Sequence, residues 1–276
     1  MRAERHWQRA RDVSERARRE GALIPLDTRI LPIPSADPFL VRQLLTATPR
    51  HLRQGGPKPN PFLPWDVPLQ VDLLEPGHVL LLNKYPVQEA HLLVITREWR
   101  PQAGWIEASD WQAVSAVSQD TGGLWFFNSG ARSGASQPHR HLQLLPRRAG
   151  ERSCPLAPLF LAQLTGRELP WNWAYHISPR TDPGGGSDLE DLYLRHSCAL
   201  GLGDPARDPH PLHPYNLLFD DQWFMTVRRL HEHGAGFSVN ALGFAGFLLS
   251  TERSDLGWLE RHGPWALLES VAAPTL

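Results

Sequence analysis

The apolar segments of this 276-residue chain are short, and their length limits the folds that the chain can adopt. The runs Val79–Leu82, Leu92–Thr96 and Leu124–Phe127 have the length of single buried strands, and turn-forming residues separate them. One clear helix begins at Ser109–Asp110, and strands and helices do not alternate as they do in a doubly wound fold. This pattern predicts an α+β fold with an antiparallel sheet and flanking helices.

A glycine-rich stretch, Thr181–Ser187, suggests a division of the chain into residues 1–180 and 181–276. The same stretch is also compatible with an insertion inside one continuous sheet. The C-terminal part is expected to contain a helix from Ser187 to Leu200 and a hairpin of Asn216–Phe219 and Trp223–Val227. It should then continue as a mostly buried strand over Phe237–Leu249, interrupted by Gly243 and Gly246, and end in a helix from Asp255 to about Val271.

Composition excludes several classes of protein. The 28 basic and 29 acidic side chains give a net charge of -1, which disfavours nucleic acid as a partner. Two cysteines are too few for a disulfide scaffold. No apolar run approaches the roughly 20 residues of a membrane-spanning helix, and the N-terminal residues lack the apolar centre of a signal peptide. We therefore expect a soluble, cytoplasmic protein.

The most informative segment of the chain is Asn128–Gln143. It ends in His-Arg-His-Leu-Gln, and residues two apart on a strand share a face, so His139, His141 and Gln143 should line one surface. Polar groups aligned on an otherwise apolar strand are costly to bury unless they have partners or a chemical task.

A loop of small residues precedes this strand. Its glycine, serine and alanine side chains allow backbone N–H groups to converge on an anion such as a phosphate. A phosphate delivered to a neutral imidazole can be attacked at phosphorus, giving a phosphoramidate that a second acceptor resolves. Either feature alone is weak evidence, because a His-x-His pair is more often a metal clip or a surface feature. Their contiguity is much more specific.

The segment resembles the diadenosine tetraphosphate phosphorylases, also called ATP adenylyltransferases. They belong to the histidine-triad superfamily, on the branch of galactose-1-phosphate uridylyltransferase. Histidine-triad hydrolases carry a third histidine where this chain has Gln143, whereas the transferase branch has glutamine. The resemblance extends from about Asn60 to Leu249, and it includes the segments Asn83–Glu98, Pro214–Leu218 and Ser238–Gly246. It implies a histidine-triad-like sheet that is extended by a C-terminal half.

The resemblance also implies roles for individual residues. His141 would be the nucleophile that takes the α-phosphorus, His139 would support its ring, and Gln143 would hydrogen-bond the transferred phosphate. Contacts to the substrate are implied for Lys84, Asn128, Gly134, Ala135, Ser136, Gln137 and Asn240.

The implied reaction is the reversible phosphorolysis of diadenosine tetraphosphate to ATP and ADP through an adenylyl-histidine. Magnesium would arrive with the nucleotide, and no protein-bound metal is expected. One alternative is a transferase acting on nucleoside diphosphate sugars, although that branch commonly has proline where this chain has Arg140. Another is a nucleotide-binding protein without catalysis, which the intact His-x-His-x-Gln strand disfavours.

Overall fold

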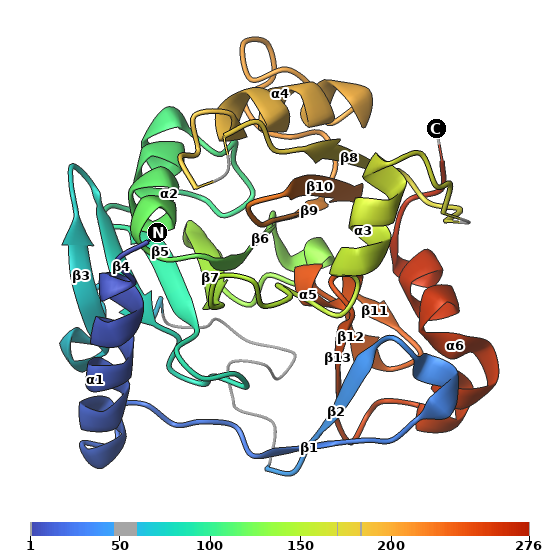
Figure 1. Cartoon of the computed structure of the whole chain (residues 1–276), viewed down its shortest axis with the longest axis horizontal. Coiled ribbons are helices and arrows are strands. Elements are labelled where there is room, and N and C mark those ends of the chain that lie inside the picture. The colour runs from blue at the N-terminus through green and yellow to red at the C-terminus, as the bar shows by residue number, and fades with distance from the viewer. Residues whose placement is uncertain (1, 47–59, 170, 183, 276) are drawn as a thin grey trace.

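The centre of the molecule is one sheet of eight strands, seen in a computed structural model that describes residues 2–46, 60–169, 171–182 and 184–275 (Figure 1). All neighbouring strands run antiparallel. The expected α+β class is confirmed. In spatial order the strands are β3 (Gln70–Leu74), β4 (His78–Leu82), β5 (Leu92–Thr96), β7 (His141–Pro146), β6 (Gly123–Asn128), β9 (Tyr215–Phe219), β10 (Trp223–Arg228) and β8 (Tyr175–Pro179).

One face of this sheet is covered by three helices: α1 (Arg5–Arg19), α2 (Ala108–Asp120) and α4 (Leu189–Ala199). They bury a continuous apolar cluster that includes Leu142 and Leu144 of β7. The predicted helices at Ser109 and after Ser187 are therefore confirmed. Residue 183 of the glycine-rich stretch lies outside the described ranges.

The opposite face of the sheet has two separate apolar clusters. The helices α3 (Ala157–Leu164), α5 (Ala241–Phe244) and α6 (Leu256–Val271) cover the larger one. The smaller one gathers five residues around β4 and β5: Phe62, Val79, Leu81, Leu93 and Ile95. The polar residues of β7 lie between these clusters.

A second sheet joins an N-terminal segment of the chain to a C-terminal one. It contains β1 (Thr28–Ile30), β2 (Leu40–Leu44) and β13 (Phe247–Ser250), and β2 pairs with β13 in parallel. Short 3₁₀ turns lie at Pro34–Ala36, Val67–Leu69 and Ala131–Ser133, and a two-residue ladder joins β11 (His233–Gly234) to β12 (Phe237–Ser238).

The expected strand over Phe237–Leu249 is wrong in its middle part. The Asn240 side chain accepts a hydrogen bond from the Leu242 N–H and so begins the short helix α5. Gly246 then turns the chain with a φ of 97° before β13 starts. Local capping therefore outweighs the apolar pattern. The helix expected to Val271 is confirmed, with a break at Gly263 where φ is 77°.

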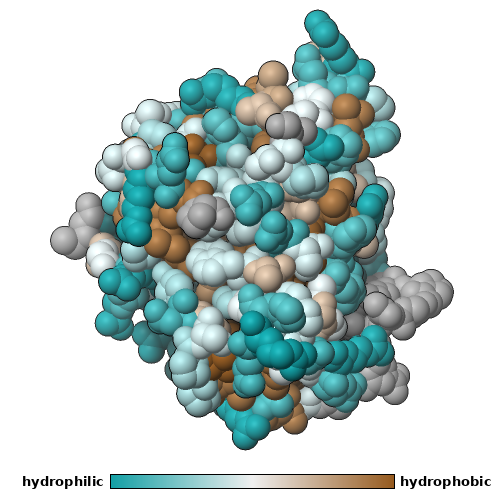
Figure 2. All heavy atoms as spheres, turned by 90° about the vertical axis from the view of Figure 1, so that its right-hand side faces the viewer, coloured by the Kyte–Doolittle hydropathy of each residue, from teal (hydrophilic) through white to brown (hydrophobic). Residues whose placement is uncertain are grey.

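Within the ranges described, no helix is both long and apolar enough to cross a bilayer. On the side of the molecule seen in Figure 2, hydrophobic atoms occur as separate spots among hydrophilic ones.

Candidate active site

The polar residues of β7 share one face of the central sheet. His141 lies opposite Ile95 of β5, and Gln143 lies between Leu93 of β5 and Phe126 of β6. Because side chains alternate along a strand, Leu142 enters the helix-covered core while its neighbours face the other way. The predicted alternation therefore places His141 and Gln143 together, in the strip between the two apolar clusters.

His141 is held as a neutral imidazole with a defined tautomer. Its Nδ1 lies 2.8 Å from the backbone carbonyl oxygen of His139. Because a carbonyl only accepts, Nδ1 carries the hydrogen, and Nε2 keeps its lone pair. Burial lowers the pKa of His141 to about 4. The ring packs at 5.5 Å from that of Phe62. This is the protonation state that a nucleophilic imidazole requires.

His139 has a different environment, because both of its ring nitrogens are hydrogen-bonded. Nε2 donates to the Thr96 carbonyl oxygen at 2.9 Å, and Nδ1 accepts from the Asn60 side-chain amide at 3.0 Å. The Asn60 oxygen is already taken by the Phe62 N–H, which fixes the direction of that amide. The side chain is fully buried and lies just before the regular part of β7. His139 therefore anchors the strand and exposes no free nitrogen.

Gln143 is hydrogen-bonded to a histidine that the sequence prediction did not include among the site residues. The Nε2 of His91 lies 3.0 Å from the Gln143 Oε1, and both side chains are 8% exposed. The Nδ1 of His91 in turn lies 3.0 Å from the Asn83 amide nitrogen. The only local signal for His91 was its position, as a polar residue directly before the apolar strand β5.

A second missed residue, Gln102, ties the ends of β6 and β7 together. Its amide group donates to the carbonyl oxygens of Asn128, at 2.7 Å, and His141, at 3.2 Å. Its oxygen accepts from the His141 N–H at 2.8 Å. These bonds fix the backbone where the small-residue loop meets the histidine strand.

Asn128 and the loop after it are joined to the C-terminal half of the chain. The Asn128 Oδ1 accepts from the Asn216 amide at 2.8 Å and from the Ala241 N–H at 2.9 Å. Gly134 has a φ of 86°, and a Cβ there would lie 2.7 Å from the Asn240 Cβ. The loop therefore touches Asn240 directly, so two of the predicted contact residues are brought together.

The remaining loop residues lie beside this contact. Ala135 and Ser136 are half-buried. The buried Oε1 of Gln137 has no hydrogen-bond partner in the described parts of the chain.

A buried guanidinium supports this junction. Arg229 is fully buried and donates to the Asn216 side-chain oxygen and to the carbonyl oxygens of His231 and Val239. Burial lowers its pKa to about 9, which still leaves it charged at neutral pH. Its hydrogen-bond partners among the described residues are uncharged groups, and the nearby Glu232 carboxylate opposes its charge only through space. The positive charge behind the loop favours anions there.

Lys84 lies in the turn between β4 and β5. Its ammonium is 3.1 Å from an Asp66 carboxylate oxygen, and both side chains are about two-fifths exposed. Within the described ranges it hydrogen-bonds none of the other predicted site residues. It neighbours Asn83 in the chain, and thus lies on the same turn as the partner of His91.

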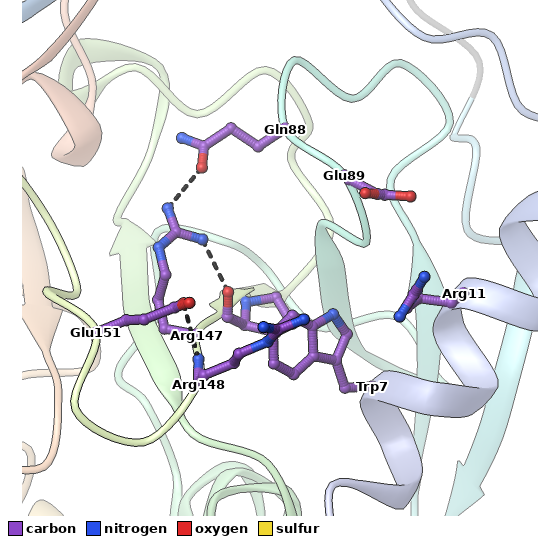
Figure 3. A pocket seen from close by; sticks show the side chains of 8 residues that line it. Trp7, Arg11, Gln88, Glu89, Arg147, Arg148 and Glu151 are labelled. Carbon is purple, nitrogen blue, oxygen red and sulfur yellow. Dashed lines mark hydrogen bonds between the residues drawn. The ribbon is translucent and has the colours of Figure 1, made fainter.

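A cavity of about 390 Å³ is lined by none of the predicted site residues (Figure 3). Three arginines and two glutamates line it around Trp7, and Arg147 donates to Gln88. It lies at the Pro146 end of β7, whereas His141 begins the strand about 16 Å away by the strand rise. In the part of the chain that the structure describes, no group of three histidine, cysteine or acidic side chains could hold a metal ion.

An antiparallel sheet that carries His-x-His-x-Gln between two apolar clusters, beside a loop of small residues, is the arrangement expected from the sequence resemblance to the transferase branch of the histidine-triad superfamily. Two family models match this chain: the Ap4A phosphorylase N-terminal domain over residues 1–162 and the ATP adenylyltransferase C-terminal domain over residues 167–274. The chain belongs to the Ap4A phosphorylase family, and the resemblance recognised in the sequence is confirmed.

Related proteins have been described in Saccharomyces cerevisiae. Diadenosine 5',5'''-P1,P4-tetraphosphate phosphorylase 2 is 28% identical over 210 residues, which cover 64% of this chain and 63% of that protein. Protein APA1 is 28% identical over 200 residues, covering 63% and 61%. The chain therefore aligns with less than two thirds of the length of these relatives.

Solved structures show the same fold. Yeast Ap4A phosphorylase Apa2 superposes with a TM-score of 0.73 at 24% identity, over 100% of this chain and 97% of that one. Its complex with Ap4A gives a TM-score of 0.72 over 98% of each chain, and its complex with AMP gives 0.74 over 100% and 99%.

Proposed function

We propose that this protein is an ATP adenylyltransferase that cleaves diadenosine tetraphosphate with inorganic phosphate, giving ATP and ADP in a reversible reaction. The observation that carries the proposal is the state of His141: a neutral imidazole whose Nδ1–H is held by the His139 carbonyl, so that Nε2 keeps its lone pair. The names of the yeast relatives and the Ap4A complex of Apa2 support the choice of substrate.

The chemistry has two steps at one phosphorus. The Nε2 lone pair of His141 attacks the α-phosphorus, the bond to the bridging oxygen breaks, and ATP leaves. An oxygen of inorganic phosphate then attacks the same phosphorus, the P–N bond breaks, and ADP leaves with a neutral His141 restored. Fixing Nδ1–H on a carbonyl keeps the attacking lone pair aimed away from the strand.

We assign supporting roles to the other site residues. His139 positions the backbone carbonyl that orients His141, and Gln143 hydrogen-bonds the transferred phosphate. Further contacts hold the phosphate chain and the nucleotide, and the buried charge of Arg229 favours the polyphosphate. These contacts are assigned to Lys84, Asn128, Gly134, Ala135, Ser136, Gln137 and Asn240.

Three other expectations complete the proposal. Magnesium binds to the polyphosphate of the nucleotide, and we assign no side chain as its ligand. The protein works in the cytoplasm, which agrees with its two unpaired cysteines, Cys154 and Cys198. The division of the chain into residues 1–180 and 181–276 stays a prediction.

Product analysis tests this function. The wild-type protein is incubated with diadenosine tetraphosphate with and without phosphate, beside His141→Ala and a control variant at the exposed His210, His210→Ala. We expect ATP and ADP only with phosphate, from the wild type and the control, and no product from His141→Ala. ATP and AMP without phosphate would indicate a hydrolase instead. Absence of turnover by the wild type would contradict the proposal and favour a sugar nucleotide or a binding role.

A further inference from the structure

A chain of hydrogen bonds leads from the turn after β4 to Gln143. The Tyr85 N–H donates to the Asn83 Oδ1 at 3.1 Å, so the amide nitrogen of Asn83 is the group that faces His91. That nitrogen donates to the His91 Nδ1, and a ring nitrogen that accepts carries no hydrogen. His91 is therefore the tautomer with its hydrogen on Nε2.

This tautomer sets the direction of the Gln143 amide. The His91 Nε2–H donates to the Gln143 Oε1 at 3.0 Å, so the NH₂ group of Gln143 must point the other way. No described residue accepts a hydrogen bond from that NH₂ group. It lies on the same face as His141, two residues along the strand.

Burial keeps His91 neutral. The side chain is 8% exposed, and burial lowers its pKa to about 4. The ring also packs at 5.6 Å from Phe126 of β6, which limits its rotation. Both the protonation state and the orientation of His91 are thus set by the fold before any ligand binds.

We propose that His91, held by Asn83, is a positioning residue that presents the Gln143 NH₂ group to the phosphoryl group being transferred to and from His141. The inference rests on the proposed function. A Gln143 amide turned by 180° would direct its oxygen at the anionic phosphoryl oxygens, where it would repel them. This chain of hydrogen bonds, from Asn83 through His91 to Gln143, is the relay, and it selects the Gln143 orientation that stabilises negative charge in the transition state.

The test uses two polar replacements that differ in reach. In His91→Gln the amide nitrogen can occupy the place of Nε2 and still donate to Gln143, whereas the shorter side chain of His91→Asn cannot reach it. We expect kcat to fall about 10-fold or more in His91→Asn, to stay within about 3-fold of the wild type in His91→Gln, and KM to change little in either.

A double-mutant cycle separates positioning from general damage. Gln143→Ala should lower kcat by about 100-fold, and adding His91→Asn to it should lower kcat no further, because the group that His91 orients is gone. The control is His196→Asn, which changes a fully buried histidine that is hydrogen-bonded to Thr226 and Ser178 on the helix-covered side. It should lower stability and leave kcat unchanged.

The outcomes are distinct. An inactive wild type would overturn the proposed function. If the wild type is active, three results would each overturn the positioning role of His91. They are full kcat in His91→Asn, a loss of kcat in His91→Gln as large as that in His91→Asn, and losses of kcat at His91 and Gln143 that multiply in the double variant. Nitrogen-15 NMR of the folded wild type provides a readout independent of activity, because a hydrogen on Nδ1 of His91 would also exclude the relay.

Discussion

Gly134 links backbone conformation to the site in a single residue. Its φ of 86° suits glycine. The α-carbon of Gly134 faces Asn240 so closely that a Cβ on Gly134 would lie 2.7 Å from the Asn240 Cβ and 2.8 Å from the Asn240 Cα. Gly150 has nearly the same φ, 85°, with no atom within 4 Å of such a Cβ. A comparison of substitutions at Gly134 and Gly150 therefore separates the effect of backbone strain from the effect of steric overlap with Asn240.

We expect Gly134→Ala to lower the free energy of unfolding by about 2 kcal/mol and Gly150→Ala by about 1 kcal/mol. Only Gly134→Ala should also lower the rate of diadenosine tetraphosphate cleavage, because it displaces the loop from Asn240. Urea denaturation and initial rates measure both effects. Equal losses of stability and activity in the two variants would contradict a role for this contact.

At the scale of elements, a buried ion pair joins helix α2 to the residue directly before β7. Asp110, in the first turn of α2, lies 2.5 Å from the Arg140 guanidinium and 2.8 Å from the His78 ring, and all three side chains are almost fully buried. Arg140 stands between the two histidines of the motif, with its side chain on the opposite face of the sheet from His141. The helix therefore fixes the strand from behind.

Removing the charge of Asp110 tests this attachment. Asp110→Asn should lower the free energy of unfolding by about 3 kcal/mol, because it leaves the Arg140 charge buried without a counter-charge. The matched control is Asp191→Asn, whose pair with Arg195 on the surface of α4 is more than half exposed on both sides. Its effect should stay below about 0.5 kcal/mol. Similar denaturation midpoints for the two variants would contradict the argument.

At the scale of the whole molecule, the sheet crosses from one half of the chain to the other where β6 pairs with β9. Three of the five buried histidines among the described residues have strongly lowered pKa values and stay neutral in this fold. Burial lowers the pKa of His91 and His141 to about 4 and that of His196 to about 3, from an ordinary value of 6.5.

Stability should therefore depend on pH. Between pH 6.5 and about 4 the unfolded chain binds protons at these histidines and the folded chain does not, so the free energy of unfolding falls as the pH falls. Urea denaturation from pH 7 to pH 4.5 measures this slope. His196→Gln, which removes one of the three groups, should flatten it. A midpoint that does not change over this range would contradict the neutral, buried state of the histidines.

Much of the fold could be predicted from local sequence. The strands at Val79–Leu82, Leu92–Thr96 and Leu124–Phe127 and the helix after Ser109 are confirmed, because periodicity and capping act within a few residues. In the segment Phe237–Leu249 the expected interruption at Gly246 is present, but the strand expected before it is wrong, because the Asn240 cap begins a short helix.

The partners of the site residues could not be predicted in this way. His91 meets Gln143 across 52 residues of chain, and Asn216 meets Asn128 across 88. Neither pair is set by any local pattern. Asn216, Gln102 and Arg229 each support the site, and each is buried by elements distant in sequence.

The sequence by itself determined that His141 and Gln143 share a face and that a loop of small residues precedes them, because alternation and loop flexibility are properties of a single chain segment. Only the tertiary structure decided that β7 lies between β5 and β6 and that β9 follows β6. Strand order depends on how the whole chain buries its apolar faces. That order brings His91 to Gln143 and the C-terminal half to Asn128.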